Sequence, residues 1–173
     1  MSGTTVRRAE PADWAAMRRA RLAALAESPA AFASTVSREL GFDEAEWRRR
    51  AGASVWFLAW RDGEPVGMVA TFAEGGQDPP GSWHLVGMWV SPEARGSGVA
   101  DQLVQAVAGH ARAAGSARLT LWVADGNARA MAFYRRLGFR PSGARQTYRR
   151  QDGTELDEQE LVLGPREPGP RGT

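Results

Sequence analysis

The segment from Trp83 to Leu103 constrains the fold more than any other stretch of the chain. An apolar run (WHLVGMWV) is followed by Ser-Pro, a glycine-rich turn (ARGSG) and a pattern typical of a helix. A glycine-rich turn before a helix N-terminus gathers backbone N–H groups that bind phosphate. The turn lacks the third glycine of a dinucleotide-binding fingerprint, and no Gly-Lys-Ser/Thr of a Walker A loop occurs. The segment therefore predicts a phosphate cradle of another kind.

Hydrophobic periodicity and turn residues divide the chain into alternating strands and helices. Strands are predicted at 5–8, 54–60, 65–73, 83–90, 118–124, 139–150 and 158–163. Helices are predicted at 11–27, 29–39, 43–50, 97–114 and 127–137. No repeat or linker interrupts this order, which indicates one α/β domain over residues 1–164. The Pro/Gly-rich tail, residues 165–173, is predicted to be disordered.

Composition removes several classes of site. With 173 residues, 43% of them hydrophobic, the chain fits a single domain with its own core. The absence of cysteine excludes disulfides, thiolate metal sites and a catalytic thiol. Only two histidines occur, so we expect no metal site. No apolar run approaches the roughly 20 residues of a membrane helix, and no secretory signal opens the chain. We expect a soluble, cytoplasmic protein without membrane contact.

The charge balance does not point to nucleic acid. The formal net charge is +2 although the sequence pI is 9.9. All 22 basic residues are arginine, and little titrates between the histidines and the two tyrosines, so a small positive charge persists to high pH. The arginine runs 48–50 and 149–150 are short and separated by acidic residues. We therefore expect no nucleic-acid partner.

The glycine-rich turn resembles the acyl-CoA-binding motif of the GNAT family of N-acetyltransferases, which reads Arg/Gln-x-x-Gly-x-Gly/Ala. Arg95, Gly98 and Ala100 fill its three named positions. The resemblance implies that the backbone N–H groups of residues 95–100 hold the diphosphate of coenzyme A. The predicted cofactor-binding residues of this strand and turn are Met88, Val90, Arg95, Gly96, Ser97, Gly98, Val99 and Ala100. The Ser97 hydroxyl would bond a phosphate or cap the helix.

A second segment, Asp125–Phe139, is similar to the later GNAT motif Asn-x-x-Ala-x-x-Phe-Tyr-x-x-x-Gly-Phe. Asn127 is a good helix N-cap, and the resemblance implies that it contacts the pantetheine arm. Tyr134 lies seven residues later, on the same helix face. The resemblance makes Tyr134 the acid that protonates the leaving thiolate. The alternative is that Tyr134 packs under the sheet beside Phe133.

Together the two motifs imply the GNAT fold and reaction. The expected fold is a mixed, mostly antiparallel sheet of about seven strands with about four helices on both faces. The expected reaction moves an acetyl group from acetyl-CoA directly to a primary amine in a ternary complex. The oxyanion donor would be the backbone N–H of Met88 or Trp89, and Val90 would pair with the pantetheine amides.

Two alternatives exist for the histidine on the same strand. Alternation places His84 on the face of Val86, Met88 and Val90, and a pKa near 6.5 suits a general base. His84 could instead be a solvent-exposed strand-end residue. Glu74, at the end of the preceding strand, is the second candidate for the base.

The sequence leaves the identity of the acetyl acceptor open. Seven tryptophans favour a small-molecule amine in an aromatic-lined pocket, while a protein N-terminus or lysine remains an alternative. The alternative function, of another class, is a sensing or regulatory module with the same fold that binds acyl-CoA without turning it over. The presence of both Asn127 and Tyr134 favours an enzyme over a sensor, because a sensor does not need the acid. The resemblance also implies a homodimer.

Overall fold

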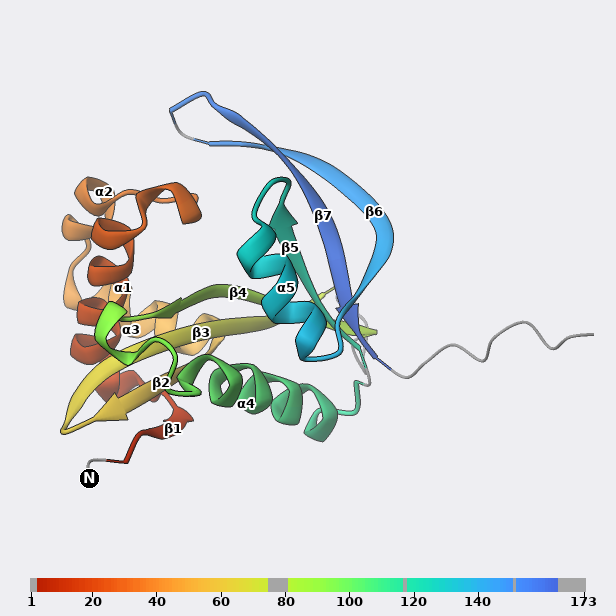
Figure 1. The fold of residues 1–173 in the computed structure, drawn as a ribbon. Coiled ribbons are helices and arrows are strands. Elements are labelled where there is room, and N and C mark those ends of the chain that lie inside the picture. The colour runs from red at the N-terminus through yellow and green to blue at the C-terminus, as the bar shows by residue number, and fades with distance from the viewer. Residues whose placement is uncertain (1–2, 75–80, 117, 151, 165–173) are drawn as a thin grey trace, which may run out of the picture.

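The computed structural model describes residues 3–74, 81–116, 118–150 and 152–164 (Figure 1). Within them the chain forms one seven-stranded sheet in the order β1-β2-β3-β4-β5-β7-β6. The strands are β1 (Thr5–Arg8), β2 (Val55–Arg61), β3 (Glu64–Glu74), β4 (Ser82–Val90), β5 (Leu119–Ala124), β6 (Arg140–Arg149) and β7 (Glu155–Leu163). Neighbouring strands run antiparallel except β4 and β5, which are parallel. The predicted mixed, mostly antiparallel sheet is confirmed.

Five α-helices accompany the sheet in the described residues, against about four expected. They are α1 (Trp14–Glu27), α2 (Val36–Leu40), α3 (Glu44–Ala53), α4 (Val99–Ala113) and α5 (Ala128–Arg136). The predicted helix 29–39 is broken into a 3₁₀ turn and the short α2, because Phe32 is extended and Thr35 caps a new helix start. Helix α4 begins two residues later than predicted, because Gly98 is its N-cap in the left-handed region. The predicted tail, residues 165–173, lies outside the described residues.

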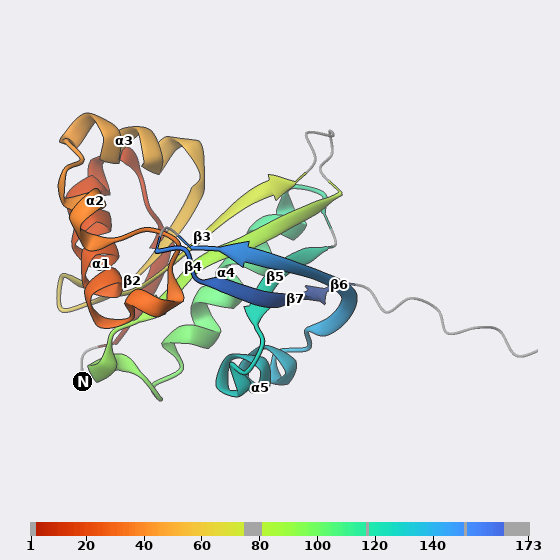
Figure 2. The ribbon, with the colours of Figure 1, turned by 90° about the horizontal axis from the view of Figure 1, so that it is seen from above.

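The helices cover the two faces of the sheet in separate layers (Figures 1 and 2). One face, here called the α1 face, packs Met17 of α1 and Trp47 of α3 against Leu58 and Met68. The other, the α4 face, packs the buried side of α4 and residues of α5 against the apolar residues of the central strands. No helix of the described segments is long and apolar enough to cross a membrane.

A β-bulge interrupts β4. Met68 pairs with Trp89 and Ala70 with Val86, so Gly87 and Met88 together lie opposite Val69 alone. Gly87 has a φ of 64°, a conformation that glycine adopts without steric cost. The extra residue reverses the alternation of side chains beyond it.

The bulge corrects one sequence prediction. His84 pairs with Phe72, and Val86 pairs with Ala70, which belongs to the α1-face core. Beyond the bulge, Met88 and Val90 contact the α4-face core instead. The prediction that His84 shares a face with Val86 is therefore confirmed, and the prediction that it shares one with Met88 and Val90 is wrong.

Strands β4 and β5 separate soon after they meet. In the described residues their registered pairs are Trp83 with Leu119 and His84 with Thr120. From there β5 continues in register with β7 as far as Ala124, opposite Glu158. The β5-facing edge of β4 is consequently unpaired from Leu85 to Val90 in the described sheet. This opening positions the candidate site.

Candidate active site

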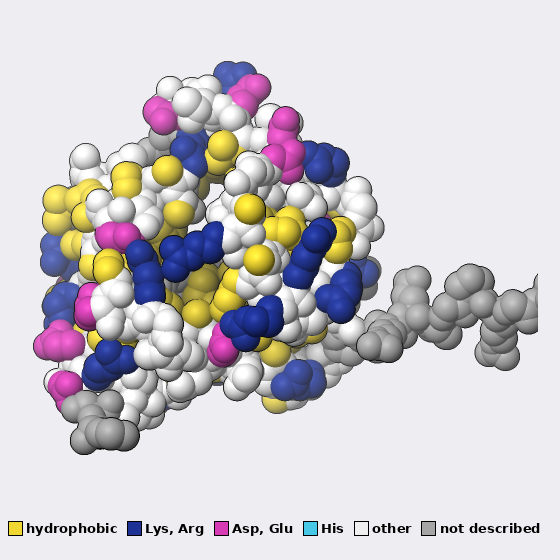
Figure 3. Space-filling model, viewed as in Figure 1, with side chains coloured by type: hydrophobic (Ala, Val, Ile, Leu, Met, Phe, Trp, Pro, Cys, Tyr) yellow, Lys and Arg dark blue, Asp and Glu magenta, His cyan; other side chains and the backbone are white. Residues whose placement is uncertain are grey.

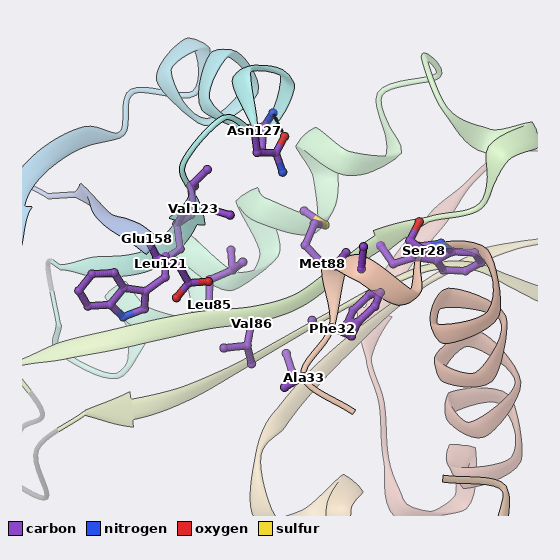
Figure 4. A pocket seen from close by; sticks show the side chains of 18 of the residues that line it. Ser28, Phe32, Ala33, Leu85, Val86, Met88, Leu121, Val123, Asn127 and Glu158 are labelled. Atoms are coloured by element: carbon purple, nitrogen blue, oxygen red, sulfur yellow. Dashed lines mark hydrogen bonds between the residues drawn. The ribbon is translucent and has the colours of Figure 1, made fainter. Parts of the chain in front are cut away.

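A cavity of about 800 Å³ occupies the opening between β4 and β5. Figure 4 shows Met88, Val86 and Leu85 of β4 on one side, with Val123 and Asn127 on the other. Phe32 and Ala33, from the connection between α1 and α2, line it from the helical side. Its centre is apolar in the space-filling view, and dark-blue arginine side chains lie around the hollow (Figure 3).

The glycine-rich turn presents free backbone donors. Gly96 and Gly98 have φ values of 75° and 82°, which other residues rarely adopt. In the described residues, no N–H group of residues 96–101 has a backbone acceptor outside helix α4, and α4 begins only at Val99. The N–H of Arg95, by contrast, already bonds the carbonyl of Pro92 at 3.3 Å. The cradle thus suits a diphosphate, with its donors starting one residue later than predicted.

The side chain of Arg95 holds the turn against helix α1. Its Nε donates to the carbonyl of Val90 at 3.1 Å, and its Nη2 donates to Oε2 of Glu27 at 2.7 Å. The indole N–H of Trp89 donates to the same carboxylate oxygen at 3.1 Å. The hydrogen bond from Arg95, helped by those from Ser28 and Trp89, lowers the pKa of Glu27 to about 2. The guanidinium of Arg95 therefore has partners within the chain.

Ser97 does not cap helix α4. Its hydroxyl donates to the carbonyl of Ala94 at 2.6 Å and accepts from Nη2 of Arg61 at 3.1 Å. Arg61, at the end of β2, thereby brings a cation to the glycine-rich turn. The sequence carries no signal for it, because Arg61 precedes Ser97 by 36 residues and only the sheet brings them together.

Helix α5 supplies both residues of the second motif. The side chain of Asn127 caps the helix by accepting from the N–H of Ala130 at 3.1 Å, as predicted. Tyr134 is 8% exposed, and its ring lies 5.0 Å from that of Phe133 and 5.4 Å from that of Phe139. Tyr134 also lines the cavity, so packing and site contact coexist. Burial raises the pKa of its phenol above the usual value of 10.

His84 is buried rather than exposed at a strand end, with 6% of its surface accessible. Its Nδ1 lies 2.7 Å from Oγ1 of Thr120 and 3.4 Å from Oε1 of Glu74. Burial lowers the pKa of the imidazole, and this effect outweighs the raising influence of Glu74, Glu160 and Glu158. The solvent-exposed alternative is therefore wrong.

The hydrogen bonds around His84 favour one tautomer. Thr120 donates its single hydroxyl hydrogen to Oε2 of Glu74 at 3.2 Å, so its oxygen is free to accept from Nδ1–H of His84. Glu74 also lies beside Nδ1 and favours a proton there. This arrangement leaves Nε2 unprotonated. The two candidate bases thus belong to one network, and Thr120, which sequence reasoning missed, connects them.

No group of three or more His, Cys, Asp or Glu side chains that could hold a metal ion occurs in the parts of the chain that the structure describes. The site's polar chemistry includes backbone amides, arginines, Asn127, Tyr134 and the His84 network.

Comparisons with known proteins identify the family of the chain. The model of the acetyltransferase (GNAT) family matches residues 20–139. A mycothiol acetyltransferase from Thermobispora bispora is 39% identical over 88 residues, a match that spans 49% of this chain and 29% of that protein. The chain thus spans less than a third of this curated relative.

Solved structures share the fold along nearly the whole chain. A protein from Salmonella typhimurium, solved with its cofactor acetyl-CoA, aligns with a TM-score of 0.76 at 20% identity over 99% of both chains. A ribosomal-protein-alanine N-acetyltransferase from Brucella melitensis aligns with a TM-score of 0.70 at 24% identity over 92% of this chain and 99% of that one. Because the family model covers well over half of its residues, the chain belongs to the GNAT family of acetyltransferases, whose acyl donor is acetyl-CoA.

Proposed function

We propose that the protein transfers an acetyl group from acetyl-CoA directly to the primary amine of a small molecule, in a ternary complex. One observation carries the proposal: the cavity at the free edge of β4 is lined both by residues next to the glycine-rich turn and by His84. Because of the bulge, Val90 and His84 face opposite sides of the sheet. A donor and an acceptor can therefore approach the same strand from different sides.

The donor side is built from backbone groups. The N–H groups of residues 96–101 would bind the diphosphate, and the unpaired edge from Met88 to Val90 would pair with the pantetheine amides. Asn127, at the start of α5, would contact the same arm. The N–H of Met88 or Trp89 would stabilise the negative charge that develops on the acyl oxygen.

The proton transfers would fall to two side chains. Nε2 of His84 would take a proton from the acceptor's ammonium group, and the freed nitrogen would attack the acyl carbon. As the N–C bond forms and the C–S bond breaks, Tyr134 would donate its proton to the sulfur. A phenol with a raised pKa stays protonated at neutral pH and is available for that step. The acylated nitrogen would then give up its second proton, which restores the phenol of Tyr134, so that a neutral amide and the coenzyme A thiol leave.

A cavity of about 800 Å³ lies in the range of small-molecule sites. Trp56, Trp89 and Trp122 are among its lining residues, which supports an acceptor with an apolar part. The expected homodimer and cytoplasmic location stay predictions.

The function is tested by free-thiol release from acetyl-CoA against aminoglycosides, amino acids, polyamines and short peptides, with acetyl-CoA binding measured by calorimetry. We expect release with a small amine and an acetylated product by mass spectrometry. Release with peptides alone would make the acceptor a protein. Tight acetyl-CoA binding without release across the panel would favour the sensor.

The pH profile tests the role of His84. A protonated imidazole cannot accept the amine's proton, so kcat/KM should fall as the pH drops through the pKa of His84. Since burial lowers that pKa, the acidic limb should lie below pH 6.5. His84→Ala should remove this limb and lower kcat/KM by about 10²-fold.

His110→Ala is the matched control, because the only other histidine packs on Trp83 and is not among the cavity's lining residues. It should keep the acidic limb. An unchanged limb in His84→Ala would show that His84 is not the base.

A further inference from the structure

Arginines dominate the charged lining of the cavity. Five of its lining residues in the described chain are arginines, namely Arg21, Arg50, Arg95, Arg129 and Arg150, whereas Glu158 is the single acidic residue among them. Arg95 is already paired with Glu27. Of the other four, Arg21 and Arg50 share the carboxylate of Glu39, so the arginines still outnumber the carboxylates around the cavity. Figure 3 shows arginine side chains beside the hollow.

Arg21 is fixed in place by a buried carboxylate. Nε of Arg21 lies 3.1 Å from Oε2 of Glu39, and its Nη2 lies 3.0 Å from Oε1. Glu39 is 0% exposed, and Nη1 of Arg50 approaches its Oε2 to 3.5 Å. The guanidinium of Arg21 also stacks on Phe32, with 4.9 Å from Cζ to the ring centroid. A guanidinium held along one edge by a carboxylate and on one face by an aromatic ring is preorganised rather than mobile.

The third nitrogen of Arg21, Nη1, lies next to strand β4. Nη1 makes no hydrogen bond to any described residue, and it lies 3.8 Å from where a Cβ on Gly87 would stand. Gly87 is the bulge residue, immediately before Met88. The spare donor of a part-buried, paired arginine therefore lies beside the point at which acyl transfer is proposed.

The opposite end of the acceptor side is acidic. Oε1 of Glu74 lies 3.4 Å from Nδ1 of His84, and the carboxylate of Glu158 lines the cavity. His84 and Gly87 are three residues apart, or roughly 10 Å along a strand. An amine would be favoured near His84, and an anion near Arg21, within the length of a molecule of amino-acid size.

We propose that the acceptor carries an oxyanion group beside its amine, and that Arg21 binds this group through Nη1, with Arg50 adding positive charge. This inference rests on the proposed function and names its substrate class. A guanidinium forms charge-assisted hydrogen bonds with a carboxylate or a phosphonate. Polyamines and aminoglycosides, which bring only positive charge, would meet like charge at this end of the cavity.

The test compares acids with their own amides. Methionine, phenylalanine, glutamine and aspartate, each with its α-carboxamide, are titrated into the protein saturated with coenzyme A, and the same pairs are assayed for thiol release; 2-aminoethylphosphonate adds a second oxyanion. We expect at least one free acid to bind and to be acetylated with a kcat/KM about 10- to 100-fold above that of its amide.

Arg21→Lys keeps a positive partner for Glu39 but loses the spare nitrogen, so it should reduce that preference by about 10-fold or more. Arg21→Gln combined with Glu39→Gln removes the buried charges together and should give the same result if the lysine variant misfolds. Arg19→Lys is the control, because Arg19 lies on the same helix and pairs with Glu64 at the surface. It should leave the preference unchanged.

Equal binding of acids and amides, a preference that survives Arg21→Lys, or turnover restricted to polyamines or aminoglycosides would overturn the oxyanion site. Turnover of amines without any binding of the acids would overturn it too, while leaving the proposed reaction intact. Arg21-dependent binding of acids without thiol release from any amine would instead contradict the proposed reaction and keep the site.

Discussion

Tyr134→Phe is expected to lower kcat by about 10²-fold or more, the usual contribution of a positioned general acid. The substitution removes only the hydroxyl and keeps the ring that packs against Phe133 and Phe139. The core and the cavity wall should therefore persist. Because the phenol would act on the departing thiolate and not on binding, the affinity for acetyl-CoA, measured by calorimetry, should stay near that of the unmodified protein.

Tyr148→Phe gives the matched control. Tyr148 is the only other tyrosine and also lines the cavity, from β6. The same loss of a hydroxyl there should leave kcat within a few-fold of the starting value. An unchanged kcat in Tyr134→Phe would restrict Tyr134 to its packing role, and equal losses in both variants would point to a general effect of cavity polarity.

Local signals in the sequence predicted much of the scaffold. The cap at Asn127 depends on a residue and its immediate neighbours, and the structure has it. Strand order is not local, and only the resemblance to a family implied the mixed, mostly antiparallel sheet. The helix predicted at 29–39 failed because an extended Phe32 and a cap at Thr35 outweighed weak helical periodicity.

The face of His84 was mispredicted for a reason that the sequence partly carries. Strict alternation holds only for a regular strand, and Gly87 in the middle of β4 is a signal for a bulge. Taking that glycine into account would have separated His84 from Met88.

The contact of His84 with Thr120 and that of Arg21 with Glu39 could not be predicted from the sequence. Thr120 reaches His84 because β4 and β5 pair at that register, 36 residues apart. Glu39 reaches Arg21 across 18 residues because α2 packs on α1. Neither contact leaves a motif, since each depends on the tertiary arrangement of otherwise ordinary charged or polar residues.

The second large expected effect concerns the ion pair of Arg21 with the buried carboxylate of Glu39. Glu39→Ala is expected to lower the free energy of unfolding by about 3–5 kcal/mol, the usual cost of breaking a buried ion pair on one side. The guanidinium of Arg21, whose side chain is 12% exposed, would keep its charge and lose the carboxylate that both its Nε and its Nη2 contact. Arg50 would suffer less, because it also contacts Glu46. Urea denaturation followed by tryptophan fluorescence measures the change.

Glu64→Ala is the control, because Glu64 meets Arg19 at the surface with 69% of its side chain exposed. Its loss should cost no more than about 1 kcal/mol. If Glu39→Ala costs as little, then water solvates Arg21 adequately and the ion pair is not needed for stability. A large loss in Glu39→Ala, together with a smaller one when Arg21 and Glu39 are both replaced by glutamine, would show that the cost comes from an unpaired buried charge. That result would also explain why a guanidinium can be held rigidly beside Gly87 with one nitrogen to spare.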